Sequence, residues 1–275
     1  MRLATFPQEV WEWLDVLGDA LLVTQAEAVL HEGFSKDTPY KDLLVRMINK
    51  DMSSLSAIYL LLRFECIHQA AAHVRLLCDA LITMHFIALD PTVRTQQFLA
   101  YADIETFEIA SALLQWESSR ARPEHVARLG AFVASAELAY QKAKPQFTHT
   151  DARGKPRPFL NWCNKKISEQ ATACGGNAVR LYSVVFKQMS SYVHGSAWSL
   201  RRQIAYSKRH YKPEVVLNDV ATIVRTALVV WIEWAKFCDS HLGWNLTADA
   251  VEIARRVDEL DASHFPVPHE GGGGL

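Results

Sequence analysis

Residues 55–89 read LSAIYLLLRFECIHQAAAHVRLLCDALITMHFIAL and contain neither glycine nor proline. Because these two residues are the strongest punctuators of secondary structure, an unbroken run of this length predicts a helix. Its longest apolar part is Leu76–Leu89, which Asp79 and His85 interrupt. It therefore falls short of the roughly 20 uninterrupted apolar residues that a membrane span needs. We expect one long central helix, about 55–89, in an all-α antiparallel helical bundle.

Glycine and proline are scarce throughout, at 12 and 10 among 275 residues, so the remaining elements should also be long helices. Proline at a first helical turn and apolar residues at helical spacing indicate where these helices begin. The expected helices are 7–32, 40–50, 91–118, 123–144, 159–171, 177–194, 213–240 and 247–260. We also expect a helix cap at Asp51, a mobile loop at 145–158 and a basic linker at 199–212.

These elements predict an N-terminal helical part at 1–50, a main bundle at 51–265 and a disordered tail at 266–275. Gly271–Leu275 is excluded from the fold because a glycine run of this kind behaves as a flexible chain. The chain has five cysteines and no Cys-x-x-Cys pair, which favours free thiols in a reducing compartment. With no apolar stretch of the secretory kind near the start, we expect a cytoplasmic protein without a membrane span.

Charge is distributed unevenly, although the formal net charge is only −1. Residues 141–213 hold fourteen lysines and arginines against two acids, Asp151 and Glu169. A basic stretch of this length is typical of a protein that binds RNA or another polyanion. The alternative is that it pairs with the acidic remainder of the same protein, or with a neutralising protein partner.

The central stretch also carries ionisable side chains, namely Arg63, Glu65, His68, His73, Arg75, Asp79 and His85. Arg75 and Asp79 are four residues apart and so share a helix face. Buried ionisable groups need partners, which leaves two alternatives: a structural salt-bridge network, or a polar site in the bundle core. Glu65 and His68 have the spacing of half a di-iron site, but no second Glu-x-x-His accompanies them. We therefore expect no metal and no cofactor.

A second group of polar residues, Tyr182, Lys187, Ser190 and His194, lies on the expected helix 177–194. His194 falls at the end of that helix, where it could act as a general acid or base because its pKa lies near neutral. The alternative is that it is structural, as most histidines at helix ends are. The expected buried face of this helix is Val179, Tyr182, Phe186, Met189 and Val193. The sequence contains no P-loop, no G-x-S-x-G and no H-E-x-x-H motif.

Three features together resemble a family of bacterial all-helical proteins of unknown function, over roughly residues 55–200. They are the Arg75-x-x-x-Asp79 pair, Trp162, and the block from Tyr182 to Ser196 with its Ser-Tyr-Val-His-Gly-Ser end. Asp79 stands where that family usually has Glu. The family is similar in turn to the HEPN helical bundles, which pair an Arg with a His a few residues later.

This resemblance implies an HEPN-like bundle, a homodimer, and a metal-independent ribonuclease of a phage-defence or toxin–antitoxin system. It maps Lys187 and His194 onto the Arg/His pair, with Lys in place of Arg. Lysine meets a phosphate as a point charge, whereas arginine can form two parallel hydrogen bonds. The alternative is a non-catalytic module that binds a protein partner, a nucleotide or RNA through 145–158 and 199–212.

On the ribonuclease interpretation, His194 is the general acid or base and Lys187 stabilises the scissile phosphate, while Ser190 and Tyr182 orient His194. The candidate substrate-binding residues are Arg180, Arg201, Arg202, Arg75 and Asp79.

Overall fold

The computed structural model describes residues 6–31, 38–193 and 213–265. Within these ranges the chain is helical apart from one short hairpin, so the predicted all-α bundle is confirmed. Contacts divide the chain into two compact units. Unit 1 comprises Met1–His85 and Ala171–Leu275, and unit 2 comprises Phe86–Gln170. The predicted boundary at residue 50 does not coincide with either limit, and the predicted tail at 266–275 lies outside the described residues.

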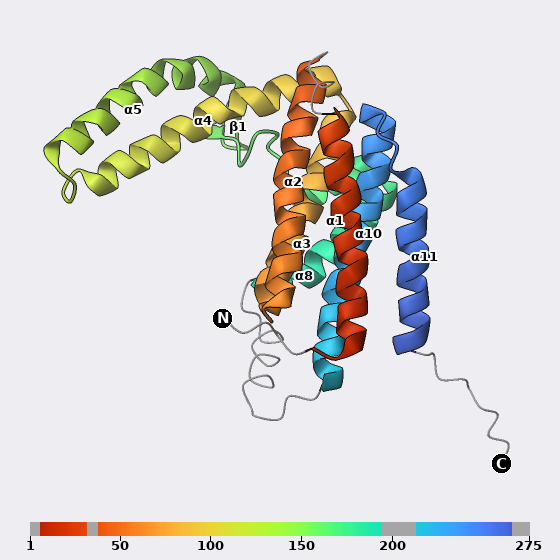
Figure 1. Cartoon of the computed structure of the whole chain (residues 1–275). Helices are drawn as coiled ribbons and strands as arrows, with labels where there is room; N and C mark the ends of the chain where they lie inside the picture. Colours follow the sequence, from red (N-terminus) through yellow and green to blue (C-terminus); the bar gives the residue numbers. More distant parts are fainter. Residues whose placement is uncertain (1–5, 32–37, 194–212, 266–275) are drawn as a thin grey trace. The chain divides into compact units, whose positions relative to one another are not determined.

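Unit 1 is a bundle of long helices (Figure 1). Its main members are α1 (Gln8–His31), α2 (Pro39–Arg63), α3 (Ile67–Ala88), α10 (Pro213–Leu242) and α11 (Thr247–His264). In Figure 1, α1, α2, α10 and α11 lie side by side, with α2 antiparallel to α1 and α11 antiparallel to α10. Large apolar side chains such as Trp13, Leu44, Ile82 and Phe237 are fully buried between these helices.

The predicted single helix 55–89 is wrong, because the chain breaks between α2 and α3. The N–H groups of Glu65 and Cys66 donate to the carbonyl oxygens of Leu62 and Leu61, at N···O distances of 3.0 and 2.8 Å. These two bonds form a Schellman motif, in which the residue after the helix cap adopts a left-handed conformation. That residue is Glu65, with φ 59°. Glycine usually occupies this position. Because Glu65 stands there instead, the break could not be recognised in the sequence.

The predicted break at Asp51 is also wrong, because α2 runs without interruption from Pro39 to Arg63. Thr38 caps this helix by accepting a hydrogen bond from the backbone N–H of Lys41, and Pro39 occupies its first turn. Asp51 lies in the interior of the helix, on its buried face. Apolar residues recur at helical spacing on both sides of this aspartate. Its side chain therefore lies in the core and does not cap a helix.

Unit 2 is built on two antiparallel helices, α4 (Pro91–Glu117) and α5 (Pro123–Ala143), close to their predicted bounds. Asp90 caps α4 by accepting from the N–H of Val93, and each helix has proline in its first turn. At the open end of this pair, Phe147 packs on Ile104 in a small core. The same unit contains Trp162, whose ring meets Phe86 and Phe98 edge-on.

The predicted loop at 145–158 contains regular structure. A short helix η2 (Lys144–Phe147) leads into a hairpin of β1 (Thr148–Thr150) and β2 (Pro156–Pro158), with His149 opposite Arg157. Asp151 closes the hairpin by accepting hydrogen bonds from the backbone N–H groups of Arg153 and Lys155, both at 2.9 Å. An aspartate that bonds its own turn in this way stabilises the reversal of the chain. The next helix, α6 (Ile167–Cys174), begins later than the predicted 159.

Among the described residues, α3 is the one helix long and apolar enough to cross a membrane by length and composition alone. More than half of its most apolar window is buried inside the protein. Such burial is what the core helix of a soluble protein shows.

Candidate functional site

The late helix that carries the predicted catalytic residues is continuous, but it is not an α-helix throughout. It consists of α7 (Gly176–Arg180), a π-helical segment η3 (Leu181–Phe186) and α8 (Lys187–Val193). A π-helix bonds five residues along the chain instead of four, so it has more residues per turn. Residues that share a face therefore recur every four positions through this stretch.

Burial along this late helix recurs at intervals of three or four residues. The buried side chains are Ala178, Leu181, Val185, Met189 and Tyr192. The predicted buried face is right at Met189 but wrong at Val179 and Val193, which are 39% and 40% exposed. Because π-helical segments recur at functional sites, the surroundings of this one are of particular interest.

One face of α3 packs against the late helix. Three side-chain contacts join them: Cys78 with Leu181, Arg75 with Phe186, and His68 with Tyr192. The Cys78 thiol donates to the Leu181 carbonyl oxygen, with Sγ···O 3.6 Å. The Arg75 guanidinium carbon lies 4.8 Å from the centre of the Phe186 ring. The structure therefore brings Arg75 to the block that begins at Tyr182, although nothing in the sequence fixes that pairing.

The arginines of the central stretch are held by aromatic rings. The guanidinium carbon of Arg63 lies 5.5 Å from the ring centres of both Trp11 and Tyr59, as Arg75 lies over Phe186. A guanidinium on the face of an aromatic ring is attracted by the ring electrons. The aliphatic part of the arginine side chain can then be buried while the charge remains stabilised. Cation–π contacts therefore contribute to the burial of these charges.

Asp79 lies half-buried on α3, one turn after Arg75. Burial raises the pKa of the Asp79 carboxyl, while the positive charges of Arg75 and Lys50 oppose that rise. The two residues thus interact electrostatically, as their spacing predicts.

The predicted catalytic residues on α8 are only partly described. The Lys187 side chain is exposed, and its Nζ lies 5.4 Å from the centre of the Tyr182 ring. The Ser190 Oγ is enclosed and has no hydrogen-bond partner among the residues that the structure describes. A buried hydroxyl without a partner costs free energy, so Ser190 stands out among the polar residues of this face. His194, Arg201 and Arg202 lie outside the described residues.

Arg180 lines a groove of about 380 Å³ between the late helix and α10. Val184 and Gln188 follow it along the groove wall at intervals of four, which is the π-helical period. Lys187 does not line this groove, although in an α-helix it would share a face with Arg180, seven residues earlier. Of these two predicted phosphate-contacting cations, Arg180 therefore lines the groove and Lys187 does not.

Charged groups on the α10 side of this groove are already engaged. Glu233 accepts from Asn177 Nδ2 at 2.6 Å and from Lys236 Nζ at 2.8 Å. Arg225 forms an ion pair with Asp261. These pairs leave little unbalanced charge on the α10 wall, so the exposed guanidinium of Arg180 is the feature that gives the groove its basic character.

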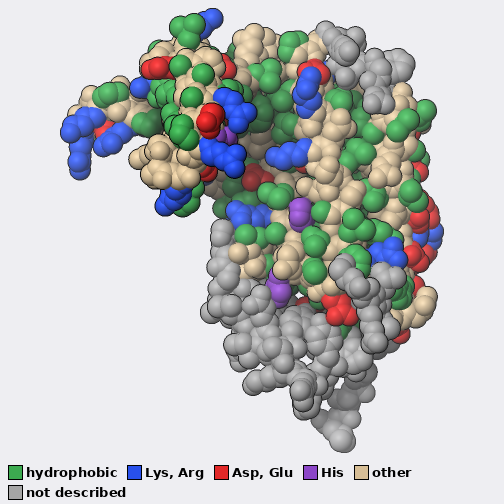
Figure 2. Space-filling view, turned by 60° about the vertical axis from the view of Figure 1, so that its left-hand side comes forward, with side chains coloured by type: hydrophobic (Ala, Val, Ile, Leu, Met, Phe, Trp, Pro, Cys, Tyr) green, Lys and Arg blue, Asp and Glu red, His purple; other side chains and the backbone are tan. Residues whose placement is uncertain are grey.

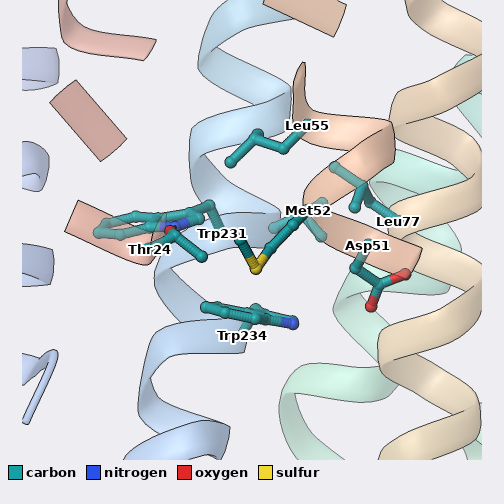
Figure 3. A pocket seen from close by; sticks show the side chains of 8 residues that line it. Thr24, Asp51, Met52, Leu55, Leu77, Trp231 and Trp234 are labelled. Carbon is teal, nitrogen blue, oxygen red and sulfur yellow. The ribbon is translucent and has the colours of Figure 1, made fainter. Parts of the chain in front are cut away.

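A second polar site, which the sequence did not reveal, lies in the core of unit 1. Figure 3 shows Asp51 beside a cavity of about 20 Å³, with the Met52 sulfur between the indole rings of Trp231 and Trp234. Asp51 is 4% exposed, and neither its Oδ2 nor the Trp234 Nε1 has a hydrogen-bond partner among the described side chains. A cavity of this size has room for one water molecule.

Burial raises the pKa of Asp51 well above its usual range, and only Lys50 opposes this. The Cys238 thiol nearby has its pKa raised as well, by burial and by the charges of Asp239 and Asp51. Burial therefore favours the protonated form of both groups. The aspartate stands at helical spacing from Ile48 and Leu55 in the sequence, and that period is the signal that could have identified it as a core residue.

Comparison with known proteins gives one match. No curated protein and no solved structure matches the chain. The model of the family of unknown function DUF5677 matches residues 41–210, which is more than half of the 275 residues. The predicted resemblance to an uncharacterised family is therefore confirmed, while the similarity to HEPN bundles stays a prediction. The matched part contains α3 and the late helix with its π-helical segment. The chain thus belongs to DUF5677, a family of unknown function.

Proposed function

We propose that the protein is a metal-independent endoribonuclease of a bacterial defence or toxin type, HEPN-like in its chemistry, acting in the cytoplasm as a homodimer. The observation that carries the proposal is the enclosed Ser190 hydroxyl, which has no hydrogen-bond partner among the described residues and stands in the sequence four residues before His194 and three after the exposed Lys187. Such a hydroxyl is suited to orient an imidazole that lies within its hydrogen-bonding reach.

In this proposal His194 takes the proton of the RNA 2′-hydroxyl or protonates the leaving oxygen, as its near-neutral pKa allows. Lys187 stabilises the charge that develops on the phosphate. Tyr182 keeps the Lys187 ammonium in place through the contact of its ring with Nζ. Arg180, Arg201 and Arg202 bind neighbouring phosphates, and Arg75 with Asp79 supports the Phe186 side of the late helix.

The surface supports RNA as the substrate. On the face drawn in Figure 2, Lys and Arg side chains lie among exposed hydrophobic side chains. Single-stranded nucleic acid contacts such surfaces with both its phosphates and its bases.

The test is a cleavage assay with total RNA and tRNA in excess EDTA. The wild type should cleave, His194→Ala should lose at least about a hundredfold in rate, and Lys187→Arg should retain activity where Lys187→Ala does not. His125→Ala is the matched control, because His125 is an exposed histidine on α5 and should leave the rate unchanged. Equal cleavage by wild type and His194→Ala, or no cleavage by folded wild type, contradicts the proposal.

The second candidate function is a non-catalytic module that binds a protein partner. Exposed apolar side chains on α4 and α5 favour it: Ile109 is 68% exposed, Trp116 61%, Phe132 51% and Leu138 81%. Exposed apolar groups of this size on neighbouring helices are typical of an interaction surface. Absence of cleavage together with capture of a specific protein through this surface would favour this candidate.

A further inference from the structure

Unit 2 contains a groove of about 660 Å³ where the open end of the α4–α5 pair meets the hairpin. Its walls come from three elements. Tyr101 and Glu108 stand on α4, Tyr140 and Lys144 lie at the end of α5 and the start of η2, and Arg157 projects from β2. The volume is within the range of pockets that enclose a small ligand.

The aromatic rings of the groove are held rigidly. Tyr140 is stacked on Phe107, with ring centres 4.2 Å apart and an interplanar angle of 21°. Tyr101 meets Phe147 edge-on at 5.1 Å. Rigid aromatic side chains lining a groove are the usual platform on which unpaired bases stack.

Positive charge lies on the α5 and hairpin side of the groove. Between 141 and 166 the sequence has seven lysines and arginines against one acid, Asp151. Asp151 accepts a hydrogen bond from Arg157 Nε at 3.1 Å, which leaves the two terminal nitrogens of Arg157 outside that bond. Lys144 is exposed, and its Nζ lies 5.3 Å from the centre of the Tyr140 ring.

Negative charge lies on the opposite wall. Glu108 is exposed on α4, and its charge contributes, after burial, to raising the pKa of Tyr101. A ligand that fits both walls needs an anionic end, an aromatic face, and an edge that donates hydrogen bonds. A nucleotide with an exocyclic amino group has all three, because a carboxylate accepts from the cytosine N4 amino group. An acidic peptide would gain nothing from Glu108.

We infer that this groove binds a nucleotide of single-stranded RNA, with its phosphate toward Lys144 and Arg157 and its base toward Tyr101 and Glu108. The choice of RNA rests on the proposed function. The groove belongs to unit 2, whereas Lys187 and Ser190 belong to unit 1, so it is a binding site separate from the proposed catalytic residues.

The experiment measures fluorescence anisotropy of the full-length protein with labelled 2′-O-methyl oligonucleotides of about ten nucleotides, poly(C), poly(A) and poly(U). These cannot be cleaved through a 2′-hydroxyl, so binding is separated from catalysis. Lys144→Ala/Arg157→Ala should weaken binding about tenfold or more and flatten its salt dependence. Arg122→Ala/Arg128→Ala, at the far end of α4 and α5, is the charge-matched control and should bind as wild type does.

The orientation is tested by base preference. The wild type should prefer poly(C) and poly(A) over poly(U) several-fold, and Glu108→Gln should reduce that preference, while Glu105→Gln on the same helix should not. Tyr101→Leu keeps an apolar side chain and should still weaken binding about tenfold through lost stacking.

Wild-type affinity in the Lys144→Ala/Arg157→Ala variant overturns the inference, even if the protein cleaves RNA. The inference is also overturned if this variant loses binding to a polyglutamate peptide as strongly as it loses binding to RNA, because the groove would then bind anions in general. Groove-dependent binding of the uncleavable RNA by a protein that cleaves nothing supports the inference while the proposed function fails.

Discussion

Asp51 is a carboxyl group on the buried face of α2, beside a cavity and an indole N–H without a described partner. Because burial raises its pKa, the folded protein keeps a proton that the unfolded chain loses above about pH 4. The unfolded state is therefore favoured as pH rises from about 4 through the folded-state pKa. Stability that is fully present at low pH is lost over that interval.

Asp51→Asn should remove this penalty because an amide needs no proton. We expect the free energy of unfolding at pH 7 to rise by about 1 kcal/mol or more, and the difference from wild type to vanish near pH 4. Urea denaturation across that pH range measures it. The control Asp42→Asn removes only an exposed pair with Arg46 and should cost about 0.5 kcal/mol or less. A loss of stability at pH 7 in Asp51→Asn would contradict the expectation.

A second prediction concerns Glu65 and the way in which helix α2 ends. Glu65 occupies the left-handed position of the Schellman motif that ends α2, with φ 59°. In this conformation a residue with a side chain is strained, whereas glycine is not. Glu65→Gly should therefore raise the free energy of unfolding by about 0.5–1 kcal/mol in urea denaturation. Glu105→Gly, in the interior of α4, should lower it by about 1 kcal/mol. If both variants are destabilised equally, the left-handed conformation is not the source of strain.

The helices whose ends are encoded locally were predictable. Pro91 and Pro123 mark the starts of α4 and α5, and the sequence places both helices within a residue or so of their bounds. The end of α2 was not predictable, because a Glu occupies the position where glycine would signal it. The π-helical segment was not predictable either, because no residue type or spacing in the sequence marks a helix with more residues per turn. The observed buried face lies one residue before the predicted one at Ala178, Leu181, Val185 and Tyr192, and coincides with it at Met189.

At the scale of the whole molecule, unit 2 is an insertion into unit 1. The chain leaves unit 1 within α3 at His85 and returns within α6 at Ala171. This division depends on contacts between segments far apart in the sequence, which no local pattern reports. The sequence offered Arg75, Tyr182 and Arg180 as candidate site residues but not Asp51, because the tryptophans that line the cavity beside it come from α10.

The two helices of unit 2 bury few side chains: Thr95, Ile104 and Ala110 on α4, and Ala143 on α5. Their backbone bonds should therefore open locally at a lower free energy than those of the core helices. In hydrogen-exchange mass spectrometry we expect residues 111–135 to exchange much faster than α10. Protection equal to that of α10 would mean that another molecule covers the exposed apolar side chains, and loss of that protection on dilution would identify a second copy.

The π-helical segment has an evolutionary consequence. A single inserted residue is enough to convert part of an α-helix into a π-helical turn, because the surrounding hydrogen bonds absorb it without breaking the helix. In an alignment, homologues lacking that residue would show a one-residue gap within Leu181–Phe186. Their counterparts of Arg180 and Lys187 would stand six residues apart, which places the two side chains about 120° apart around an α-helix. The extra residue would then be recognisable in the sequence alone, as a mark of the branch of the family that carries it.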